Sequence, residues 1–446
     1  MDIIMNPINR RAFVKQGVIA TASFAVLSGR QAVAANEKIV IGVVGLGGRG
    51  SSLAEMFAKT PNVEIAYLCD VDSRRFSRAR AAIEELQDKA PKVVQDFRRV
   101  LEDKSVHAII NATPDHWHAL ASIMACQAGK DVYVEKPLAH NIWEGRKMVE
   151  AARKYQRVIQ VGTQSRSAPY IKQAKELIAS GKIGDVHIVK VFNMMQHPFQ
   201  KPGPEQPVPA GLDYETWCGP AAKLPYSPNR SWLNLWEYSC GPIPGDAVHQ
   251  LDLARYITGD IPYPKNVSQM GAIYALTDGR DTPDTQIATF AYDKFTLLYE
   301  ASLWTPYLKK TPGEVRDSDG IPQWQFNSTR IEVLGTKGMM YVGRHGDGLQ
   351  VFNSDGTAVL SDPGKQADKE HINNFLECIR TREKPIADVE QGHYSTLLCH
   401  MANCSFRSGN QQLEWDPSTE TFVNNPVANK FAKRSYRAPW SIPDPV

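Results

Sequence analysis

The sequence predicts an α/β protein with two domains: a doubly wound parallel sheet, followed by an α/β domain with an open, largely antiparallel sheet. Three observations predict this fold. Strand-like and helical segments alternate from residue 38 to residue 164, a glycine-rich turn follows the first strand, and the later strands follow one another without helices between them. With 446 residues, 42% of them hydrophobic and 22% charged, the chain is long enough for two cores.

The first domain is predicted from apolar runs that end at turn residues. Residues 38–44 cluster Ile and Val as a buried strand does, and residues 51–60 have helical composition with an apolar face. The same alternation continues to residue 164, which predicts parallel strands joined by helices. The predicted strands are 38–44, 63–70, 106–113, 131–137 and 157–164, and the helices between them include 51–60, 116–129 and 141–156.

Between the first strand and its helix, three glycines form the pattern GxGxxG. Gly45 permits a tight turn, Gly47 lets a pyrophosphate approach the backbone, and Gly50 lets helix and strand pack closely. The helix N-terminus then offers free N–H groups to phosphates. GxGxxG alone also occurs in ordinary glycine-rich turns, so the strand and helix on either side carry the prediction of a dinucleotide-binding Rossmann domain.

The end of the second predicted strand bears on which dinucleotide binds. Asp70 stands where a carboxylate accepts hydrogen bonds from the adenosine ribose and repels a 2′-phosphate, which favours NAD. Arg74 and Arg75 follow closely and are either a solvated helix start or partners for a 2′-phosphate, so NADP stays possible.

Two segments carry candidate catalytic groups. Lys136 ends a strand between Glu135 and a proline, where its ammonium can hydrogen-bond a substrate hydroxyl, or merely pair with Glu135 on the surface. His249 is a candidate general base whose tautomer a carboxylate would fix, with Asp246 three residues before it and Asp252 three after it on adjoining parts of one helical face. A histidine that only packs at a helix start is the alternative.

Other polar and aromatic residues suggest binding or packing. His116 and His118 lie in a predicted loop without a third clustered ligand, so no metal site is expected and we interpret them as residues flanking the cofactor. Trp232 and Trp236 precede the His249 segment, where flat aromatic faces suit stacking on a sugar ring, although core packing explains them as well.

The net charge and the cysteine content argue against several other classes of protein. A net charge of +3, with basic and acidic residues interspersed, does not predict a nucleic-acid partner. The seven cysteines form no CxxC pair, which argues against a disulfide framework or a structural zinc site. No later stretch reaches the roughly 18 apolar residues of a membrane span, so none is expected after signal removal.

The N-terminus resembles an export signal. Arg10 and Arg11 precede an apolar stretch over 17–27 and the small residues Ala32 to Ala34. Paired arginines followed by Phe13 and Lys15 resemble a twin-arginine signal, whose pathway carries folded proteins, often with a bound cofactor. We therefore expect a signal over residues 1–34 and a periplasmic or otherwise exported protein, unless the arginines form a chance pair before an ordinary helix.

Several strings together resemble one family. "GVVGLGGRG", "LCDVD", "TPDHWHA", "VEKPLA" and "GDAVHQLDLARY" occur in the order seen in the glucose-fructose oxidoreductase, inositol dehydrogenase and MocA family (Gfo/Idh/MocA). "LDYETWCGPA", a long string from His371 to Gly409 and "YRAPW" resemble its exported, twin-arginine branch. The resemblance spans nearly the whole chain after the predicted signal.

The resemblance implies a Rossmann domain over 35–163 and a substrate-binding and oligomerisation domain over 164–446, and therefore a homo-oligomer. It implies that Lys136 is the "EKP" lysine and His249 the catalytic histidine. The family commonly places an aspartate four residues before that histidine, with a glycine between them, whereas Asp246 is three before His249 and the glycine is missing. Asp246 keeps the assignment, with Asp252 as a substitute.

The expected activity is hydride transfer between NAD(P) and a secondary hydroxyl or keto group of a sugar, sugar derivative or polyol, with a tightly bound cofactor. An NAD-dependent glycoside hydrolase that works by transient oxidation and elimination is the alternative, and a non-catalytic sugar-binding protein a third. The predicted catalytic residues are Lys136, His249 and Asp246; the cofactor contacts Gly45, Gly47, Gly48, Arg49, Gly50, Asp70, Arg74, Thr113, Pro114, His118, Glu135 and Lys136; and the substrate contacts Gln164, Trp232, Trp236 and Asp252.

Overall fold

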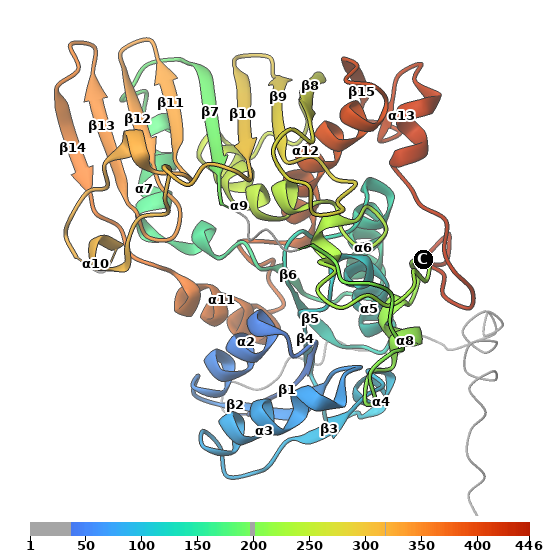
Figure 1. Ribbon diagram of the computed structural model, residues 1–446. Coiled ribbons are helices and arrows are strands. Elements are labelled where there is room, and N and C mark those ends of the chain that lie inside the picture. Colours follow the sequence, from blue (N-terminus) through green and yellow to red (C-terminus); the bar gives the residue numbers. More distant parts are fainter. Residues whose placement is uncertain (1–36, 197–200, 317) are drawn as a thin grey trace, which may run out of the picture.

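The computed structural model describes residues 37–196, 201–316 and 318–446, so the predicted signal lies outside the described residues. Two sheets dominate the structure (Figure 1). The first has six parallel strands in the order β3-β2-β1-β4-β5-β6, and the chain reverses its direction of travel across the sheet between β1 and β4. Its strands are β1 (Ile39–Val44), β2 (Val63–Cys69), β3 (Lys92–Val94), β4 (Ala108–Asn111), β5 (Asp131–Val134) and β6 (Ile159–Val161).

The predicted doubly wound sheet is confirmed, because its strands are parallel and helices cover both faces. These strands are largely buried and rich in Val and Ile, as expected for a parallel sheet between helices. The edge strand β3 has no counterpart among the predicted strands, since it is only three residues long. The connecting helices are α2 (Gly48–Ala58), α3 (Phe76–Glu84), α4 (Arg98–Glu102), α5 (Asp115–Gln127) and α6 (Ile142–Lys154).

The second sheet has ten strands and is antiparallel except for the pair β7 and β10. This confirms an open, largely antiparallel second sheet. The strands are β7 (Val186–Met194), β8 (Asn266–Ala272), β9 (Thr285–Ala291), β10 (Thr296–Ser302), β11 (Ile331–Gly335), β12 (Gly338–Val342), β13 (Leu349–Asn353), β14 (Ala358–Asp362), β15 (Leu413–Asp416) and β16 (Thr421–Phe422).

Three helices cover one face of this sheet: α7 (Pro169–Ala179), α9 (Pro242–Ile257) and α12 (Val389–Arg407). Their apolar residues and the inward residues of the strands form the largest core of the described protein. The opposite face carries exposed apolar side chains: Met270 and Ile287, which are paired across β8 and β9, are 72% and 47% exposed. Within the described residues, no helix covers this face at β8 and β9, and we call it the helix-free face.

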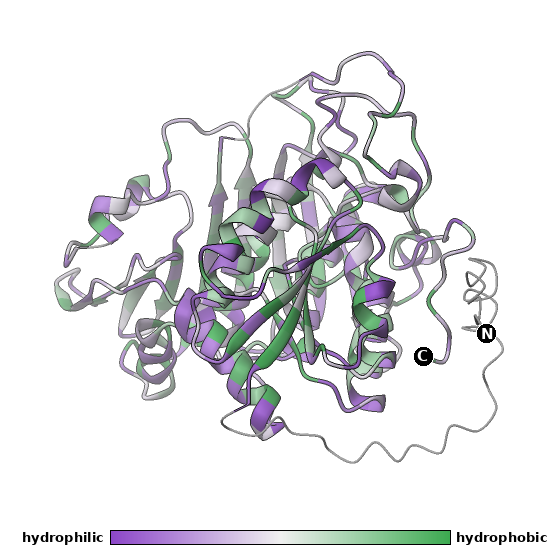
Figure 2. Ribbon diagram, turned by 90° about the horizontal axis from the view of Figure 1, so that it is seen from below, coloured by the Kyte–Doolittle hydropathy of each residue, from purple (hydrophilic) through white to green (hydrophobic). Residues whose placement is uncertain are grey.

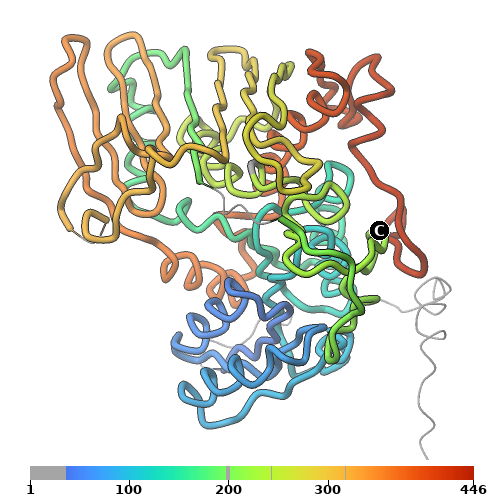
Figure 3. The backbone as a smooth tube through the Cα atoms, viewed as in Figure 1, coloured from blue at the N-terminus to red at the C-terminus, as the bar shows by residue number. Residues whose placement is uncertain are grey.

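The C-terminal part of the chain returns to the first sheet. Helix α11 (Asp368–Thr381) lies beside α2, and its Phe375 ring packs at 6.2 Å from Phe57 and 5.8 Å from Tyr133 (Figures 1 and 3). The predicted division at residue 163 therefore separates the two sheets, whereas the core of the first includes residues from far beyond it.

The remaining elements are short. Figure 2 shows the hydrophobic colours gathered on the strands in the middle, and hydrophilic ones on outward helix faces. None of the helices within the described ranges is both long and apolar enough to cross a bilayer. The short elements are α8 (Tyr214–Cys218), α10 (Gly313–Arg316), α13 (Pro426–Phe431), and the 3-10 helices η1 (Ser73–Arg75), η2 (Gln164–Ser167), η3 (Trp232–Asn234) and η4 (Trp324–Phe326).

Candidate active site

The three glycines after β1 differ in what a side chain would contact at each position. Gly45 has a φ of 91°, and a Cβ there would lie 2.5 Å from the carbonyl oxygen of Ala112. A Cβ on Gly50 would lie 1.9 Å from the carbonyl oxygen of Gly45. At Gly47 the nearest atom to such a Cβ is 4.0 Å away, on Arg75. Packing of the protein therefore requires Gly45 and Gly50, whereas Gly47 leaves the backbone at the start of α2 open to a ligand.

Asp70 is fixed at the end of β2 by two backbone donors. Its carboxylate accepts hydrogen bonds from the N–H of Leu46 at 2.7 Å and of Asp72 at 2.9 Å. Burial raises its pKa, while these donors and Arg75, whose Nε lies 3.9 Å away, act in the opposite direction. Arg74 instead makes two 2.7 Å hydrogen bonds to Asp72. A carboxylate held in this way fits the ribose hydroxyls of NAD.

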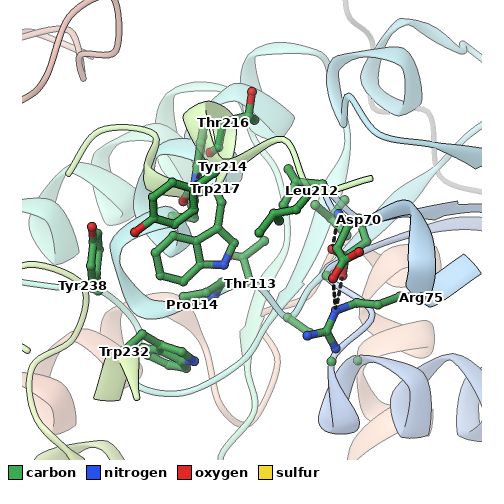
Figure 4. Close-up of a pocket in the computed structure, with 18 of the residues that line it drawn as sticks. Asp70, Arg75, Thr113, Pro114, Leu212, Tyr214, Thr216, Trp217, Trp232 and Tyr238 are labelled. Atoms are coloured by element: carbon green, nitrogen blue, oxygen red, sulfur yellow. Dashed lines mark hydrogen bonds and ion pairs between the residues drawn. The ribbon is translucent and has the colours of Figure 1, made fainter. Parts of the chain in front are cut away.

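A cavity of about 500 Å³ opens against the glycine turn and Asp70. Its other wall is a segment that precedes α9, from Leu212 to Tyr238, which we call the cover segment (Figure 4). The N–H of Asp213 donates to the carbonyl of Val71 at 2.9 Å, and the N–H of Ser73 donates to the carbonyl of Gly211 at 2.9 Å. Nine of the predicted cofactor contacts line this cavity: Gly45, Gly47, Gly48, Arg49, Gly50, Asp70, Arg74, Thr113 and Pro114.

His118 lies outside that lining. Both histidines lie in the first turn of α5, which agrees with the predicted helix over 116–129 and corrects their interpretation as loop residues. The ring nitrogens of His118 contact the carbonyls of Pro137 at 2.7 Å and Thr113 at 2.8 Å. Those of His116 contact the carbonyls of Tyr238 at 3.1 Å and Trp217 at 2.9 Å. They tie the turns around the cavity together, and the described residues contain no metal-binding group of three or more ligands.

Glu135 and Gln164 belong to a polar cluster beside the glycine turn. Glu135 is buried and accepts a 2.7 Å hydrogen bond from Arg49 Nε, and Asp368 lies 3.3 Å from Arg49 Nη2. Burial lowers the pKa of Arg49, but Glu135, Tyr133 and Asp368 together raise it above its usual range. The Gln164 side chain lies against Arg49 and Asp368. Helix α11 thus contributes Asp368, which no motif indicated, to the edge of the nucleotide cavity.

Lys136 and α9 meet where β5 ends. Lys136 Nζ donates to the carbonyl of Gly245 at 2.7 Å. His249, one helical turn further along α9, is only 4% exposed, and its Nδ1 has no hydrogen-bond partner. Burial lowers the pKa of His249 well below its usual range, and the neighbouring cations Arg344 and Lys136 lower it further. A neutral imidazole with a free ring nitrogen is suited to accept a proton.

The two candidate aspartates of α9 make contacts other than those predicted. Asp246 forms an ion pair with Arg344 at 3.0 Å, which corrects the expectation that its carboxylate holds the ring of His249. Asp252 accepts hydrogen bonds from Arg166 at 2.8 and 3.1 Å, and both residues are 1% exposed. Because both oxygens of Asp252 are occupied in this buried pair, its predicted contact with substrate is replaced by a structural role.

The two candidate tryptophans are separated. Trp232 lines the nucleotide cavity, near Trp217 and Tyr238 (Figure 4). Trp236 lies at another pocket, where Arg407 approaches its ring at 5.0 Å. The expectation that both rings stack on one substrate is therefore corrected, because Trp232 lines the nucleotide cavity and Trp236 lines a different pocket.

This fold and site define a class: a two-domain protein with a dinucleotide cavity and a lysine and histidine beside it. Sequence models identify residues 39–163 as an oxidoreductase-family NAD-binding Rossmann fold, 171–341 as a GFO/IDH/MocA C-terminal domain, and 328–442 as an oxidoreductase-family C-terminal alpha/beta domain. The chain belongs to the Gfo/Idh/MocA family and is an NAD-dependent oxidoreductase.

The relatives cover different shares of the chain. Myo-inositol 2-dehydrogenase of Thermotoga maritima is 25% identical over 82% of this chain and 95% of its own length. Levoglucosan dehydrogenase of Pseudarthrobacter phenanthrenivorans is 30% identical over 37% of this chain and 36% of its own.

Solved structures share the fold. A levoglucosan dehydrogenase in complex with NADH and levoglucosan matches with a TM-score of 0.64 at 18% identity, covering 85% of this chain and 99% of its own. The WlbA dehydrogenase of Bordetella pertussis, in complex with NADH and UDP-GlcNAcA, matches with a TM-score of 0.63 at 20% identity, over 85% of this chain and 99% of its own.

Proposed function

We propose that this chain interconverts a secondary hydroxyl and a keto group on a sugar, sugar derivative or polyol. The observation that carries the proposal is the meeting of Lys136 with α9 beside His249, at the edge of the sheet that holds the nucleotide cavity. The dehydrogenases of inositol and levoglucosan among its relatives support the substrate class. The relatives reported above are named dehydrogenases, which favours this activity over glycoside hydrolysis.

The two side chains divide the proton chemistry between them. Bound NAD supplies the acceptor or donor of hydride. His249, buried and neutral, takes the proton of the substrate hydroxyl on a ring nitrogen during oxidation and returns it during reduction. The ammonium of Lys136 hydrogen-bonds the same oxygen and stabilises the charge that develops there.

We further propose that the cofactor stays bound between turnovers. The cover segment forms one wall of the nucleotide cavity and is hydrogen-bonded to residues 71–73, which would hinder the release of a bound nucleotide. A retained cofactor must be restored by a second substrate or a redox partner. Retention also suits the export that the twin-arginine pattern suggests, because a folded protein can carry its cofactor with it.

The test is to denature the purified protein and identify the released nucleotide by mass spectrometry. We expect near-stoichiometric NAD. Gly211→Ala should reduce it, because Gly211 has a φ of 89° and a Cβ there would lie 2.8 Å from Ser73 Oγ, at the point where the cover segment is attached. Gly356→Ala is the matched control, with a φ of 83° and no atom within 4 Å of the added Cβ.

The results separate the alternatives. Protein that carries no nucleotide, and binds it only loosely, contradicts the retained cofactor. Reduction of bound NAD by sugars or polyols supports the dehydrogenase, whereas release of free sugar from an aryl glycoside without net NADH supports the hydrolase. Unchanged turnover in a Lys136→Ala variant would restore the non-catalytic interpretation.

A homo-oligomer is also proposed, with the helix-free face of the second sheet as the interface. The exposed Met270 and Ile287 on that face support it, because monomeric proteins rarely leave large apolar patches uncovered. Light scattering of the wild type and of a Met270→Glu variant tests this, and a wild-type monomer would contradict it.

A further inference from the structure

A group of cations surrounds Asp246 beside the proposed catalytic pair. Arg344 Nη1 lies 3.0 Å and Lys310 Nζ 3.9 Å from Asp246 Oδ2. Lys136 is also near enough to act on this carboxylate electrostatically. Three cations thus face one carboxylate. Arg344 and Lys310 come from the second sheet and its loops, far along the chain from α9.

The charges further out include carboxylates as well as cations. Asp115 acts on Lys136, Glu135 pairs with Arg49, and Arg316 and Asp347 are one of each sign. The excess of cations is therefore local to Asp246.

Several nitrogens at this place are buried without a partner. They are Nε of Arg344, Nε2 of His345 and Nδ1 of His249, and Arg344 as a whole is only 4% exposed. The rings of His249 and His345 lie 6.3 Å apart. A buried polar atom without a hydrogen bond destabilises the protein, so such a group of them is typical of a site that a polar ligand completes.

The group is open to solvent on the side of Lys310. The Lys310 side chain is 47% exposed and that of Asp246 is 16% exposed, whereas Arg344 and His249 lie deeper. A ligand that enters from solvent therefore meets Lys310 before it reaches Arg344 and His249.

We propose that the substrate of this site is an anionic sugar, a sugar acid whose carboxylate is bound by Lys310 and Arg344 while its hydroxyl faces Lys136 and His249. The inference rests on the proposed function and narrows its substrate class. A guanidinium and an ammonium together match a carboxylate. The same two groups also match a phosphate, which the experiment below tests.

The test compares acids with their neutral counterparts on the purified protein. Glucuronate, galacturonate and gluconate are set against glucose, galactose and myo-inositol, and reduction of the bound nucleotide is followed by absorbance. We expect higher kcat/KM for an acid than for its neutral counterpart. In Lys310→Gln the ratio of acid to neutral kcat/KM should fall by about tenfold or more, the loss of one charge-assisted hydrogen bond. Lys309→Gln removes the same charge one residue earlier and should leave the ratio unchanged.

Calorimetry provides a readout that does not need turnover. Glucuronate should bind wild-type protein more tightly than glucose and more tightly than it binds Lys310→Gln. Neutral sugars turned over as well as the acids would overturn the anionic substrate and leave the proposed function standing. A sugar phosphate preferred over both would overturn the carboxylate. Absence of nucleotide reduction by any sugar, with glucuronate still bound through Lys310, would overturn the proposed function alone.

Discussion

Replacing Asp252 with asparagine separates its structural role from the catalytic one that its place in the sequence suggests. In the folded protein Asp252 pairs with Arg166 through two hydrogen bonds, and Ser395 Oγ donates a third at 2.7 Å. Asp252→Asn leaves the guanidinium of Arg166, which is 1% exposed, with only Asp260 as an ionised partner at 3.0 Å.

The expected loss follows from that burial. Removing one member of a buried ion pair costs about 3–5 kcal/mol, because the remaining charge stays desolvated. Asp260 retains part of the attraction to Arg166, so we expect about 3 kcal/mol. A matched control is Asp293→Asn, whose partner Lys265 lies at 2.5 Å on the surface, with side chains 78% and 67% exposed. Its loss should stay below about 1 kcal/mol.

Urea unfolding followed by circular dichroism measures the two losses, and kcat/KM is measured on the same preparations below the unfolding range. We expect Asp252→Asn to lower the unfolding midpoint while folded protein keeps its kcat/KM and its bound nucleotide. An Asp252→Asn protein that is as stable as the wild type but has no turnover would refute the structural role of Asp252. It would support the predicted contact of Asp252 with the substrate.

Three further predictions concern the other site residues. Lys136→Met should lower kcat by roughly 10²–10⁴-fold while the nucleotide is retained, as measured by turnover and mass spectrometry. Gly47→Ala should unfold at the same urea concentration as the wild type but lose nucleotide, whereas Gly50→Ala should lose stability, because its Cβ would lie 1.9 Å from the oxygen of Gly45. Burial raises the pKa of Asp347 from 3.8 to about 6, so its contribution to stability is present below pH 3.8 and is lost as the pH rises through 6. Asp347→Asn should flatten this loss, measured by unfolding at pH 4 and pH 7.

The sequence predicts the first sheet well because local signals determine it. Buried parallel strands are apolar runs, and the glycine turn marks a place where the backbone can approach a nucleotide. The predicted cofactor residues from Gly45 to Pro114 accordingly line one cavity. The opposite wall of this cavity has no such local signal in the sequence. The cover segment is proline-rich and irregular, and tertiary hydrogen bonds to residues 71–73 and to His116 and Trp117 bring it across the cavity.

The roles of the two aspartates of α9 could not be predicted from the local sequence. Helical spacing places Asp246 and Asp252 equally well beside His249, since each is three residues away. Their roles are decided by arginines distant in the sequence: Arg344 is 98 residues from Asp246, and Arg166 is 86 residues from Asp252. The sequence of α9 does not indicate which arginine each carboxylate contacts.

The position of Asp246 has a consequence for Lys136. Moving a carboxylate by one residue turns it by about 100° around a helix axis. An aspartate three residues before His249, instead of the four that are common in the family, points to Arg344, and Lys136 Nζ bonds the carbonyl of Gly245, which occupies the fourth position. A neutral carbonyl orients the ammonium without cancelling its charge. The shift therefore gives Lys136 a neutral hydrogen-bond partner in Gly245, and gives Asp246 to the cations that we assign to a substrate carboxylate.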